Sequence, residues 1–225
     1  MLYDVVIIGG GPAGLSAALT LGRGRKRVLL CDAGPRRNAA AVHVNGFVTR
    51  DPITPNEFRR TAREQLTKYG NVEVRDTGIE AITGDAGAFE VHLSDGRVTA
   101  RRVILATGMI DDVPDIEGFR ALWGSGIFQC PYCHGWEVQD RRFGYLASSP
   151  EMLGFALLLR GWTRHVTVFS GGAFPVPGEQ RELFARAGVT VDERGITRLV
   201  GSEGHLAQLD FTDGAPVSLD VLFAH

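Results

Sequence analysis

The chain has 225 residues, enough for one large domain or two of ordinary size. Hydrophobic residues make up 44% of the chain and charged residues 22%, which is ordinary for a soluble globular protein. The formal net charge of −2 gives no electrostatic signature of a protein that binds nucleic acid or an anionic membrane, so we expect neither partner.

The chain carries no signal for export or membrane insertion. No apolar run reaches the ~18 residues expected of a membrane span. The N-terminus leads directly into an apolar strand without a basic segment, so we expect no signal peptide. Three cysteines are too few for the disulfide scaffold of a secreted protein, and we interpret Cys31 as a small buried hydrophobe. We therefore expect a cytoplasmic protein.

The N-terminal part has the pattern of a βαβ unit. Residues 5–8 are a short apolar, β-branched run typical of a strand in a parallel sheet, 9–14 form a glycine-rich turn, and 15–23 predict a helix of small residues. A second parallel strand is predicted over 27–31, and it ends at Asp32. The unit has the expected length of about thirty residues.

A helix and several strands follow this unit. An amphipathic helix is predicted from Pro55 to about Tyr69, where Gly70 stops it. Four strands with turn signals between them are predicted at 72–74, 79–82, 88–93 and 98–105. We interpret them as a small antiparallel meander that leads back to the sheet.

The second half shows another α/β pattern. The best candidate for a domain boundary lies at residues 113–118. Beyond it, the expected elements are a strand at 143–147, a helix at 150–161, a strand at 165–169, a helix at 179–187 and three more strands to residue 223. We predict an α/β protein with two Rossmann-like domains, 1–114 and 115–225, of which the first contains the meander.

The glycine-rich turn has the spacing of a dinucleotide-binding loop. In Gly9-x-Gly11-x-x-Gly14 the first glycine permits a tight turn, the second lets the backbone approach a pyrophosphate, and the third allows close packing of helix and strand. Phosphates then meet the N–H groups at the helix N-terminus. Asp32 follows Gly14 by 18 residues, where its carboxylate can accept hydrogen bonds from ribose hydroxyls. A glycine-rich turn without a ligand is the alternative.

Residues 130–134 read C-P-Y-C-H, a redox-type cysteine pair. A pair at this spacing at a helix start brings two thiols within disulfide reach, and the helix N-terminus and the neighbouring sulfur lower the pKa of one thiol. The thiolate attacks in exchange, and His134 suits proton transfer near neutral pH. Zinc binding is the main competing interpretation. A zinc site needs two further ligands, and the sequence has no second C-x-x-C and no H-x-x-x-H that could supply them. An inert pair is the other alternative.

With these motifs the chain resembles the low-molecular-weight thioredoxin reductase family, in particular FAD-dependent disulfide oxidoreductases with a C-P-Y-C-H-G-W-E motif or a similar one. The resemblance covers essentially the whole chain and is clearest at residues 5–14, 103–108 and 130–137. It implies an FAD-binding domain, an inserted NADPH domain that carries the cysteines, and a homodimer.

The resemblance also implies roles for single residues. Cys133 would lie next to the flavin, Cys130 would attack the substrate disulfide, and His134 would be the acid–base where thioredoxin reductases have an aspartate. Asn45 would lie in a flavin-side loop. The implied cofactor-binding residues are Gly9, Gly11, Pro12, Ala13, Gly14, Asp32, Asn45, Ala106, Thr107 and Gly108. No metal ligand is implied.

Two departures from the family pattern concern the nucleotides. Residues 144–154 lack a G-x-G-x-x-G/A loop, and 169–174 replace the basic cluster that grips the 2′-phosphate of NADPH. NADPH is therefore an uncertain cofactor, and we expect weak or no binding. The family closes with a further FAD segment containing a G-D motif, whereas this chain stops at residues 222–225. We expect FAD binding by this chain to be incomplete or unusual.

The sequence therefore predicts an FAD-dependent dithiol–disulfide oxidoreductase. It would pass electrons between flavin and the Cys130–Cys133 pair and on to thioredoxin, a thioredoxin-like protein or a small-molecule disulfide. The same chemistry can run backwards as a dithiol oxidase. The alternatives are a flavoprotein that takes electrons from a donor other than NADPH, and a degenerate flavin-binding redox sensor.

Overall fold

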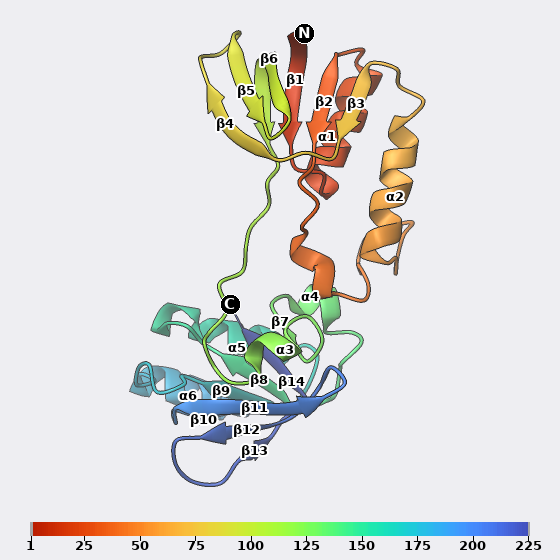
Figure 1. Cartoon of the computed structure of the whole chain (residues 1–225). Coiled ribbons are helices and arrows are strands. Elements are labelled where there is room, and N and C mark those ends of the chain that lie inside the picture. Colours follow the sequence, from red (N-terminus) through yellow and green to blue (C-terminus); the bar gives the residue numbers. More distant parts are fainter. Residues whose placement is uncertain (1, 225) are drawn as a thin grey trace. The chain divides into compact units, whose positions relative to one another are not determined.

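The computed structural model describes residues 2–224, and the chain divides into two compact units (Figure 1). Unit 1 consists of Met1–Ala39 and Ile53–Asp111, and unit 2 consists of Ala40–Pro52 and Asp112–His225. A division into domains after residue 114 stays a prediction. The segment 40–52, which lies early in the sequence, is grouped with the second unit.

Unit 1 is built on a six-stranded sheet with the order β3-β2-β1-β6-β5-β4. The strands are β1 (Leu2–Ile8), β2 (Val28–Cys31), β3 (Val72–Arg75), β4 (Ile79–Thr83), β5 (Phe89–Leu93) and β6 (Gly96–Leu105). Strand β1 pairs in parallel with both β2 and β6, and β6 then pairs antiparallel with β5. The parallel part and the meander are therefore one continuous sheet.

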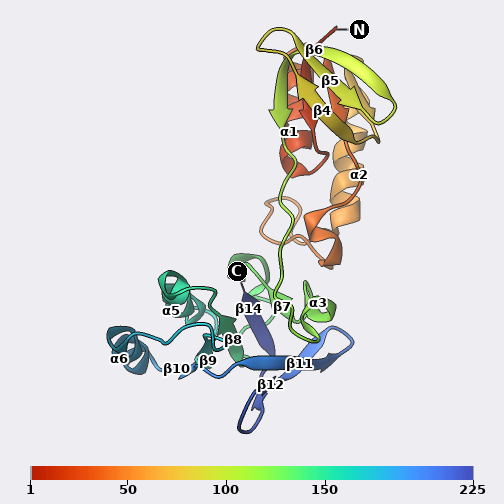
Figure 2. The ribbon, with the colours of Figure 1, turned by 60° about the vertical axis from the view of Figure 1, so that its left-hand side comes forward.

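Two helices cover one face of this sheet. Helices α1 (Pro12–Arg23) and α2 (Pro55–Leu66) lie side by side (Figure 2), and a 3₁₀ turn, η1 (Arg37–Ala40), precedes α2. Alternate residues of β2 point to opposite faces, as a strand requires. Val28 and Leu30 pack with the residues of the two helices, and Leu29 and Cys31 pack with β5 and β6. The buried position of Cys31 confirms its interpretation as a core residue.

The meander is smaller than expected, because β3 does not belong to it. Strand β3 pairs in parallel with β2 at the edge of the sheet, so the antiparallel part contains only β4, β5 and β6. The helical connection through α2 returns the chain in the direction of β2, which gives a parallel pair. Asn71 fixes this arrangement, since its carbonyl accepts a hydrogen bond from Val28 N at 2.9 Å and its amide donates to Gly22 O at 3.0 Å.

The predicted start of α2 at Pro55 is confirmed. The Thr54 side chain caps the helix by accepting a hydrogen bond from Glu57 N at 3.2 Å, and proline suits the first helical position. The helix ends at Leu66, a few residues earlier than expected. Thr67 bends the chain there, because its N–H and its hydroxyl both donate to Glu64 O.

Unit 2 has a five-stranded parallel sheet with the order β10-β9-β8-β14-β7 and a separate three-stranded antiparallel sheet, β11-β12-β13. The parallel strands are β7 (Ile127–Phe128), β8 (Phe143–Leu146), β9 (Val166–Phe169), β10 (Val189–Asp192) and β14 (Val221–Ala224). The others are β11 (Ile196–Ser202), β12 (His205–Phe211) and β13 (Val217–Ser218). The helical segments are α3 (Phe119–Leu122), α4 (Pro131–His134), η2 (Pro150–Gly154), α5 (Phe155–Leu159) and α6 (Gly178–Ala187).

Two expectations for this half were wrong. The predicted helix at 150–161 is a 3₁₀ turn, η2, followed by the short helix α5. Five strands follow α6, where three were expected. Hairpin β11–β12 carries bulges, which interrupt the alternation that sequence reasoning relies on, and β13 has only two residues.

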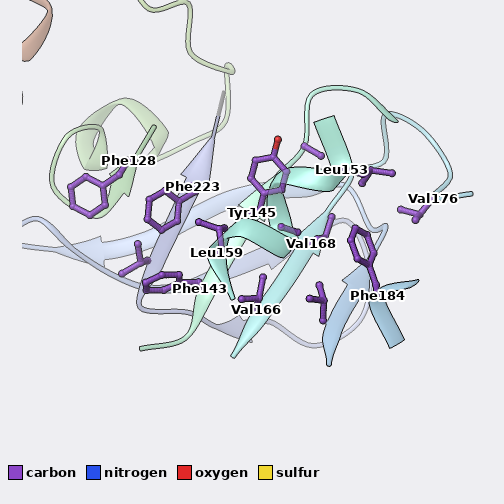
Figure 3. Packing of buried hydrophobic residues seen from close by; sticks show 14 of the residues in the cluster. Phe128, Phe143, Tyr145, Leu153, Leu159, Val166, Val168, Val176, Phe184 and Phe223 are labelled. Carbon is purple, nitrogen blue, oxygen red and sulfur yellow. The ribbon is translucent and has the colours of Figure 1, made fainter. Parts of the chain in front are cut away.

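Unit 2 has three layers with an apolar core on each face of the parallel sheet. Every residue of β8 and β14 is buried, as expected for strands covered on both faces. On one face, Phe143, Tyr145 and Phe223 pack with residues of η2, α5 and α6 (Figure 3). On the other face, Leu146 and Leu222 pack with leucines of β11 and β12.

None of the helices between residues 2 and 224 has both the length and the apolar composition that a membrane crossing needs. Over the same residues, no three His, Cys, Asp or Glu side chains are grouped so that they could hold a metal ion.

Candidate functional site

The structure groups the predicted site residues into two sets, one in each unit. Unit 1 contains the set with the glycine turn, namely Gly9, Gly11, Pro12, Ala13, Gly14, Asp32, Ala106, Thr107 and Gly108. Unit 2 contains the set with the cysteine pair, namely Asn45, Cys130, Cys133 and His134.

Two glycines of the first set are required by the packing of the turn itself. Gly9 has φ +109°, and a Cβ there would overlap the carbonyl oxygen of Ala106. A Cβ on Gly14 would overlap the carbonyl oxygen of Gly9. These positions hold β1, α1 and the end of β6 close together, whether or not a ligand is present.

Gly11 differs, because the fold does not explain its lack of a side chain. No atom lies within 4 Å of the place where its Cβ would be, and its φ of −78° suits any residue. Gly11 is also the N-cap of α1, and no described side chain caps that helix. The first N–H groups of a helix lack partners within it, so Ala13 and Gly14 can donate to an anion here. Bare backbone beside open space is what a pyrophosphate needs.

Asp32 lies directly after β2 and is buried. Its Oδ1 accepts a hydrogen bond from Gly34 N at 3.0 Å, and its Oδ2 accepts one from Arg59 Nε at 3.0 Å. Burial acts to raise the pKa of Asp32, but the hydrogen bonds and the charges of Arg59 and Arg63 outweigh it and hold the pKa below its usual value. Each carboxylate oxygen has two acceptor sites, so Asp32 retains capacity for a ribose hydroxyl.

Sequence reasoning missed two neighbours of Asp32. A Cβ on Gly10 would overlap the Asp32 carboxylate, so this glycine is as constrained as Gly9. Arg59, on α2, holds Asp32 from a distance of 27 residues in sequence. The unbroken G-G-G run was the only signal for Gly10, and nothing in the sequence paired Arg59 with Asp32.

A cavity of about 550 Å³ opens beside Asp32 at the ends of β2 and β3. Its volume lies within the range of small-molecule sites. It is lined by Asp32, Ala33, Gly34, Arg59, Asp76, Thr77, Gly78, Ser94 and Asp95. The cavity places hydrogen-bonding groups where a nucleotide bound at the glycine turn would have its ribose.

The chain leaves β6 through the predicted Ala106-Thr107-Gly108 segment. Ala106 N donates to Ile8 O at 2.8 Å, which ties this segment to the end of β1. Gly108 has φ +69°, a conformation that favours glycine. Ala106 is also the residue against which Gly9 packs, so the predicted A-T-G segment and the glycine turn are in contact.

In unit 2, the two cysteines lie on one helical turn. Cys130 is the N-cap of α4, Cys133 N donates to Cys130 O at 3.2 Å, and both thiols are free. Burial raises the pKa of Cys133 to about 12, and a hydrogen bond to Cys130 adds to the effect. The sequence predicted a lowered pKa for one thiol of the pair without saying which, and this stays a prediction. Cys133 is not that thiol, because its burial dominates.

His134 is held beside the pair by an aromatic neighbour. Its ring stacks on Phe128, with centroids 4.4 Å apart and planes 13° apart. Burial lowers the pKa of His134, and Glu137 opposes the effect only in part, so the imidazole is neutral at pH 7. Its Nδ1 is buried and lacks a hydrogen-bond partner among the described residues. A neutral imidazole with an open nitrogen can accept a proton.

Asn45 lies at the cysteine pair. Its Nδ2 donates to Cys133 O at 2.8 Å, across 88 residues of sequence, and both residues belong to unit 2. A contact of Asn45 with flavin stays a prediction from the resemblance. No sequence signal linked Asn45 to Cys133.

Two aromatic side chains next to the cysteines face solvent. Tyr132 is 72% exposed and Trp136 is 73% exposed. Tyr132 packs edge-on against Trp162, with ring centroids 5.1 Å apart. A Cβ on Gly135 would lie 2.8 Å from Trp162, so Gly135 lets α4 sit directly on that ring. Helix α4, which carries Cys133, therefore packs on the Trp162 ring.

The turn after β8 stands in unit 2 where the glycine turn stands in unit 1. It leads into η2, which begins at Pro150. The buried Tyr145 hydroxyl donates to Met152 O at 3.1 Å, and the Tyr145 ring packs on Phe155 with centroids 4.9 Å apart. Burial raises the pKa of Tyr145 to about 12. Tyr145 therefore ties the end of β8 to η2 and α5, and the residues between them include none of the glycines of a nucleotide-binding turn before Gly154.

Comparison with known proteins gives consistent results. Residues 3–201 match the model of the pyridine nucleotide-disulphide oxidoreductase family. The chain is 36% identical over 233 residues to a thioredoxin reductase of Claviceps purpurea, with 98% of this chain and 72% of that protein covered. It is 30% identical over 224 residues to a thioredoxin reductase of Aspergillus oryzae, with 95% and 71% covered.

A solved structure and a shorter match complete the comparison. The crystal structure of an oxidoreductase from Agrobacterium tumefaciens superposes with a TM-score of 0.93 at 41% identity, and covers 100% of this chain and 75% of that chain. The chain spans only 44% of a relative from Arthroderma benhamiae, to which it is 36% identical over 177 residues. The chain therefore belongs to the pyridine nucleotide-disulphide oxidoreductase family, as a thioredoxin-reductase-like FAD-dependent disulfide oxidoreductase.

Proposed function

We propose that this chain carries out dithiol–disulfide exchange at Cys130 and Cys133, with FAD as the electron carrier. One observation carries the proposal. Two free thiols share a single helical turn, Cys133 is hydrogen-bonded to Cys130, and a neutral histidine follows directly. A pair in that position can close and reopen a disulfide without rearrangement of the chain.

The residues of unit 1 fit the FAD of the family. Gly11 presents bare backbone, Ala13 and Gly14 offer N–H groups to the phosphates, and Asp32 offers a carboxylate to the ribose. Pro12 starts the helix that orients these groups, and Ala106, Thr107 and Gly108 border the turn. When bound, FAD supplies a carrier that accepts or delivers two electrons at a time.

The cysteines divide the chemistry in the reducing direction. The Cys130 thiolate attacks one sulfur of a substrate disulfide, a mixed disulfide forms, and the first substrate thiolate leaves. Cys133 then loses its proton and attacks the Cys130 sulfur, so the Cys130–Cys133 disulfide forms and the second substrate thiolate leaves. Two electrons and two protons must return to this disulfide before the next cycle.

His134 is the residue proposed to handle the proton of this exchange. The raised pKa of Cys133 means that its thiol needs a base before it can attack. His134 is adjacent in sequence and neutral at pH 7, since burial lowers its pKa. Because its pKa is lowered, His134 becomes protonated only at more acidic pH. We therefore expect it to remain a neutral base at pH values below the ordinary histidine pKa of about 6.5.

The substrate proposed first is the disulfide of a thioredoxin-like protein, because the relatives from Claviceps purpurea and Aspergillus oryzae are named thioredoxin reductases. A small-molecule disulfide is the second substrate class. We also propose a homodimer, as the resemblance implies, and a cytoplasmic location, as the sequence predicts. Sedimentation of the purified protein and localisation of a tagged chain test these two points.

A donor other than NADPH is the second functional candidate, and the turn after β8 favours it. Residues 147–152 contain no glycine, and the Tyr145–Met152 hydrogen bond and the Tyr145–Phe155 contact tie this turn to β8. Addition of NADPH to the FAD-loaded protein without oxygen should therefore bleach the flavin band slowly or not at all, and dithionite should bleach it fully. Rapid bleaching at micromolar NADPH would contradict this candidate.

Three cysteine variants test the proposed function. Cys130→Ser and Cys133→Ser should each abolish turnover of a disulfide substrate by the FAD-loaded protein with a chemical reductant. Cys31→Ser is the matched control, because Cys31 is buried in unit 1 and burial raises its pKa to about 11. Full activity in either of the first two variants would reject the proposal.

A further inference from the structure

We infer that Asn45 is a positioning residue of the redox pair, which holds the peptide group between Cys133 and His134. The inference rests on the proposed function, since it assigns a part in that chemistry to a residue far away in sequence. The observation behind it is the hydrogen bond of 2.8 Å from Asn45 Nδ2 to Cys133 O.

The position of this bond gives it mechanical importance. Helix α4 has a single turn, Pro131–His134. The last carbonyl groups of a helix accept no hydrogen bond from the helix itself. Pro131 O accepts a hydrogen bond from Gly135 N at 2.6 Å, and Cys130 O accepts one from Cys133 N at 3.2 Å. Asn45 supplies a donor to Cys133 O from outside the helix. One bond thereby fixes the peptide that joins the second cysteine to the histidine.

Other contacts hold the two residues that follow Cys133. The His134 ring lies on Phe128, and Gly135 lies against Trp162. Both contacts act on the C-terminal side of Cys133. Loss of the Asn45 bond would leave the Cys133 carbonyl, and with it the direction of the Cys133 side chain, free to turn about this fixed base.

Asn45 is itself anchored, which a positioning residue must be. The loop that follows it is closed by Gly46 N, which donates to Asp51 Oδ1 at 3.0 Å, and by Arg50 N, which donates to Phe47 O at 2.8 Å. Gly46 has φ +75°, a conformation that favours glycine and lets the loop turn directly after Asn45. The segment 40–52 is grouped with unit 2, so Asn45 and Cys133 belong to the same compact body.

This geometry affects the two thiol steps differently. Attack by Cys130 on an external disulfide depends on the Cys130 thiolate and on access, and Asn45 makes no bond to Cys130. Attack by Cys133 on the Cys130 sulfur is a reaction within the chain, and its rate depends on how well Cys133 is aimed. Asn45 therefore controls the second step and leaves the first unchanged.

The test measures the rates of the two thiol steps in the full, FAD-loaded chain. The protein is first reduced with dithiothreitol, and the dithiothreitol is then removed in the absence of oxygen. The probe is the aromatic disulfide dithiobis(nitrobenzoate), which releases one coloured thiolate when Cys130 attacks and a second when Cys133 closes the disulfide. The rate of the first phase is proportional to the probe concentration, and the rate of the second phase is independent of it. Cys31 is buried and contributes to neither.

Asn45→Ala and Asn45→Asp should slow the second phase by roughly threefold to tenfold, the equivalent of one hydrogen bond, and should leave the first phase unchanged. Asn45→Asp keeps the size of the side chain and loses the donor, so it carries the test if Asn45→Ala fails to fold. Asn56→Asp is the matched control. Asn56 lies on α2 and uses its Oδ1 to accept from Arg36 Nη1 at 2.6 Å, a bond that aspartate keeps, so both phases should stay as in the wild type.

The outcomes separate this inference from the proposed function. An unchanged second phase in both Asn45 variants would overturn the inference, and so would an equal loss in both phases, which indicates a structural role only. If the unmutated chain shows no second phase at all, then the pair does not close a disulfide and the proposed function itself fails.

Discussion

The turns after β1 and after β8 occupy the same place in the parallel parts of two sheets, yet they are built in opposite ways. After β1, backbone packs on backbone at Gly9 and Gly14, and the space over Gly11 stays open. After β8, the Tyr145 side chain reaches Met152 and packs on Phe155. Topology determines where a nucleotide site can be, and the residues of the turn determine whether one exists.

The first turn thus has the close backbone packing and the open space that a dinucleotide site requires. Its helix α1 has twelve residues and begins at the turn, whereas α5 has five and begins after a 3₁₀ segment. The expected assignment of FAD to the first unit and the doubt about NADPH both follow from this difference.

Alanine substitution at two glycines of the first turn should give two different defects. Gly14→Ala forces a Cβ onto the Gly9 carbonyl and should lower the free energy of unfolding by about 3 kcal/mol. Gly11→Ala has room and an ordinary φ, so its unfolding free energy without FAD should fall by less than about 1 kcal/mol. Urea unfolding of the two variants without FAD measures both values.

Gly11→Ala should nevertheless weaken FAD binding by roughly tenfold or more, because a methyl group then occupies the space of close approach. Fluorescence titration with FAD measures the affinity. Wild-type affinity in Gly11→Ala would show that the open space over Gly11 is not used by the cofactor, and that the first turn differs from the second only in packing.

Much of this contrast could be predicted from the sequence, because glycine spacing and strand composition are local signals. The G-x-G-x-x-G pattern after an apolar β-branched run located the first turn, and its absence at residues 144–154 indicated that the second is unlike it. The contacts that hold the second turn could not be predicted. Tyr145 and Phe155 are ordinary apolar residues in sequence, and only the 3₁₀ geometry of η2 brings Met152 O under the Tyr145 hydroxyl.

Asp32→Asn should remove a charge-assisted bond beside the first turn. Arg59 would lose the Asp32 carboxylate and keep the longer ion pair with the exposed Asp76 at 3.6 Å, so the free energy of unfolding at pH 7 should fall by about 2 kcal/mol. The folded-state pKa of Asp32 is depressed, so its contribution is complete above the ordinary carboxyl pKa of about 3.9 and is lost as the pH falls through the folded value. Wild type and Asp32→Asn should therefore converge in stability as the pH falls through the depressed folded-state pKa of Asp32.

Urea unfolding at neutral and at acid pH measures this convergence. Asp95→Asn is the control, because Asp95 lines the same cavity but is exposed, and its substitution should change stability by less than about 0.5 kcal/mol. A difference between wild type and Asp32→Asn that persists unchanged in acid would mean that Asp32 acts through packing and not through its charge.

Tyr145→Phe should have the smallest effect and should sharpen the view of the second turn. It removes the hydroxyl that donates to Met152 O and should cost about 1 kcal/mol, because Met152 O loses this hydrogen bond and keeps the one from Phe155 N. Tyr132→Phe is the matched control, since Tyr132 is exposed and should give no change. Thermal unfolding checks both, and an unchanged Tyr145→Phe would show that the hydroxyl does not hold η2.

The reacting residues of the redox site could be predicted from the sequence, but the residues that surround them could not. Cys130, Cys133 and His134 stand together in sequence, so their spacing alone identified them. Asn45 and Phe128 reach the site through the fold, and the exclusion of water that raises the pKa of Cys133 also depends on tertiary packing. Local patterns therefore identify the reacting groups, whereas positioning and electrostatics require the structure.

The electron capacity of the FAD-loaded chain tests the central claim most directly, because it counts the redox groups that communicate. Dithionite titration of the oxidised wild type without oxygen should consume one two-electron equivalent for the flavin and a second for the Cys130–Cys133 disulfide. Cys130→Ser should consume only the first equivalent. Equal consumption by wild type and Cys130→Ser would contradict the account, since it would mean that the cysteine pair exchanges no electrons with the flavin.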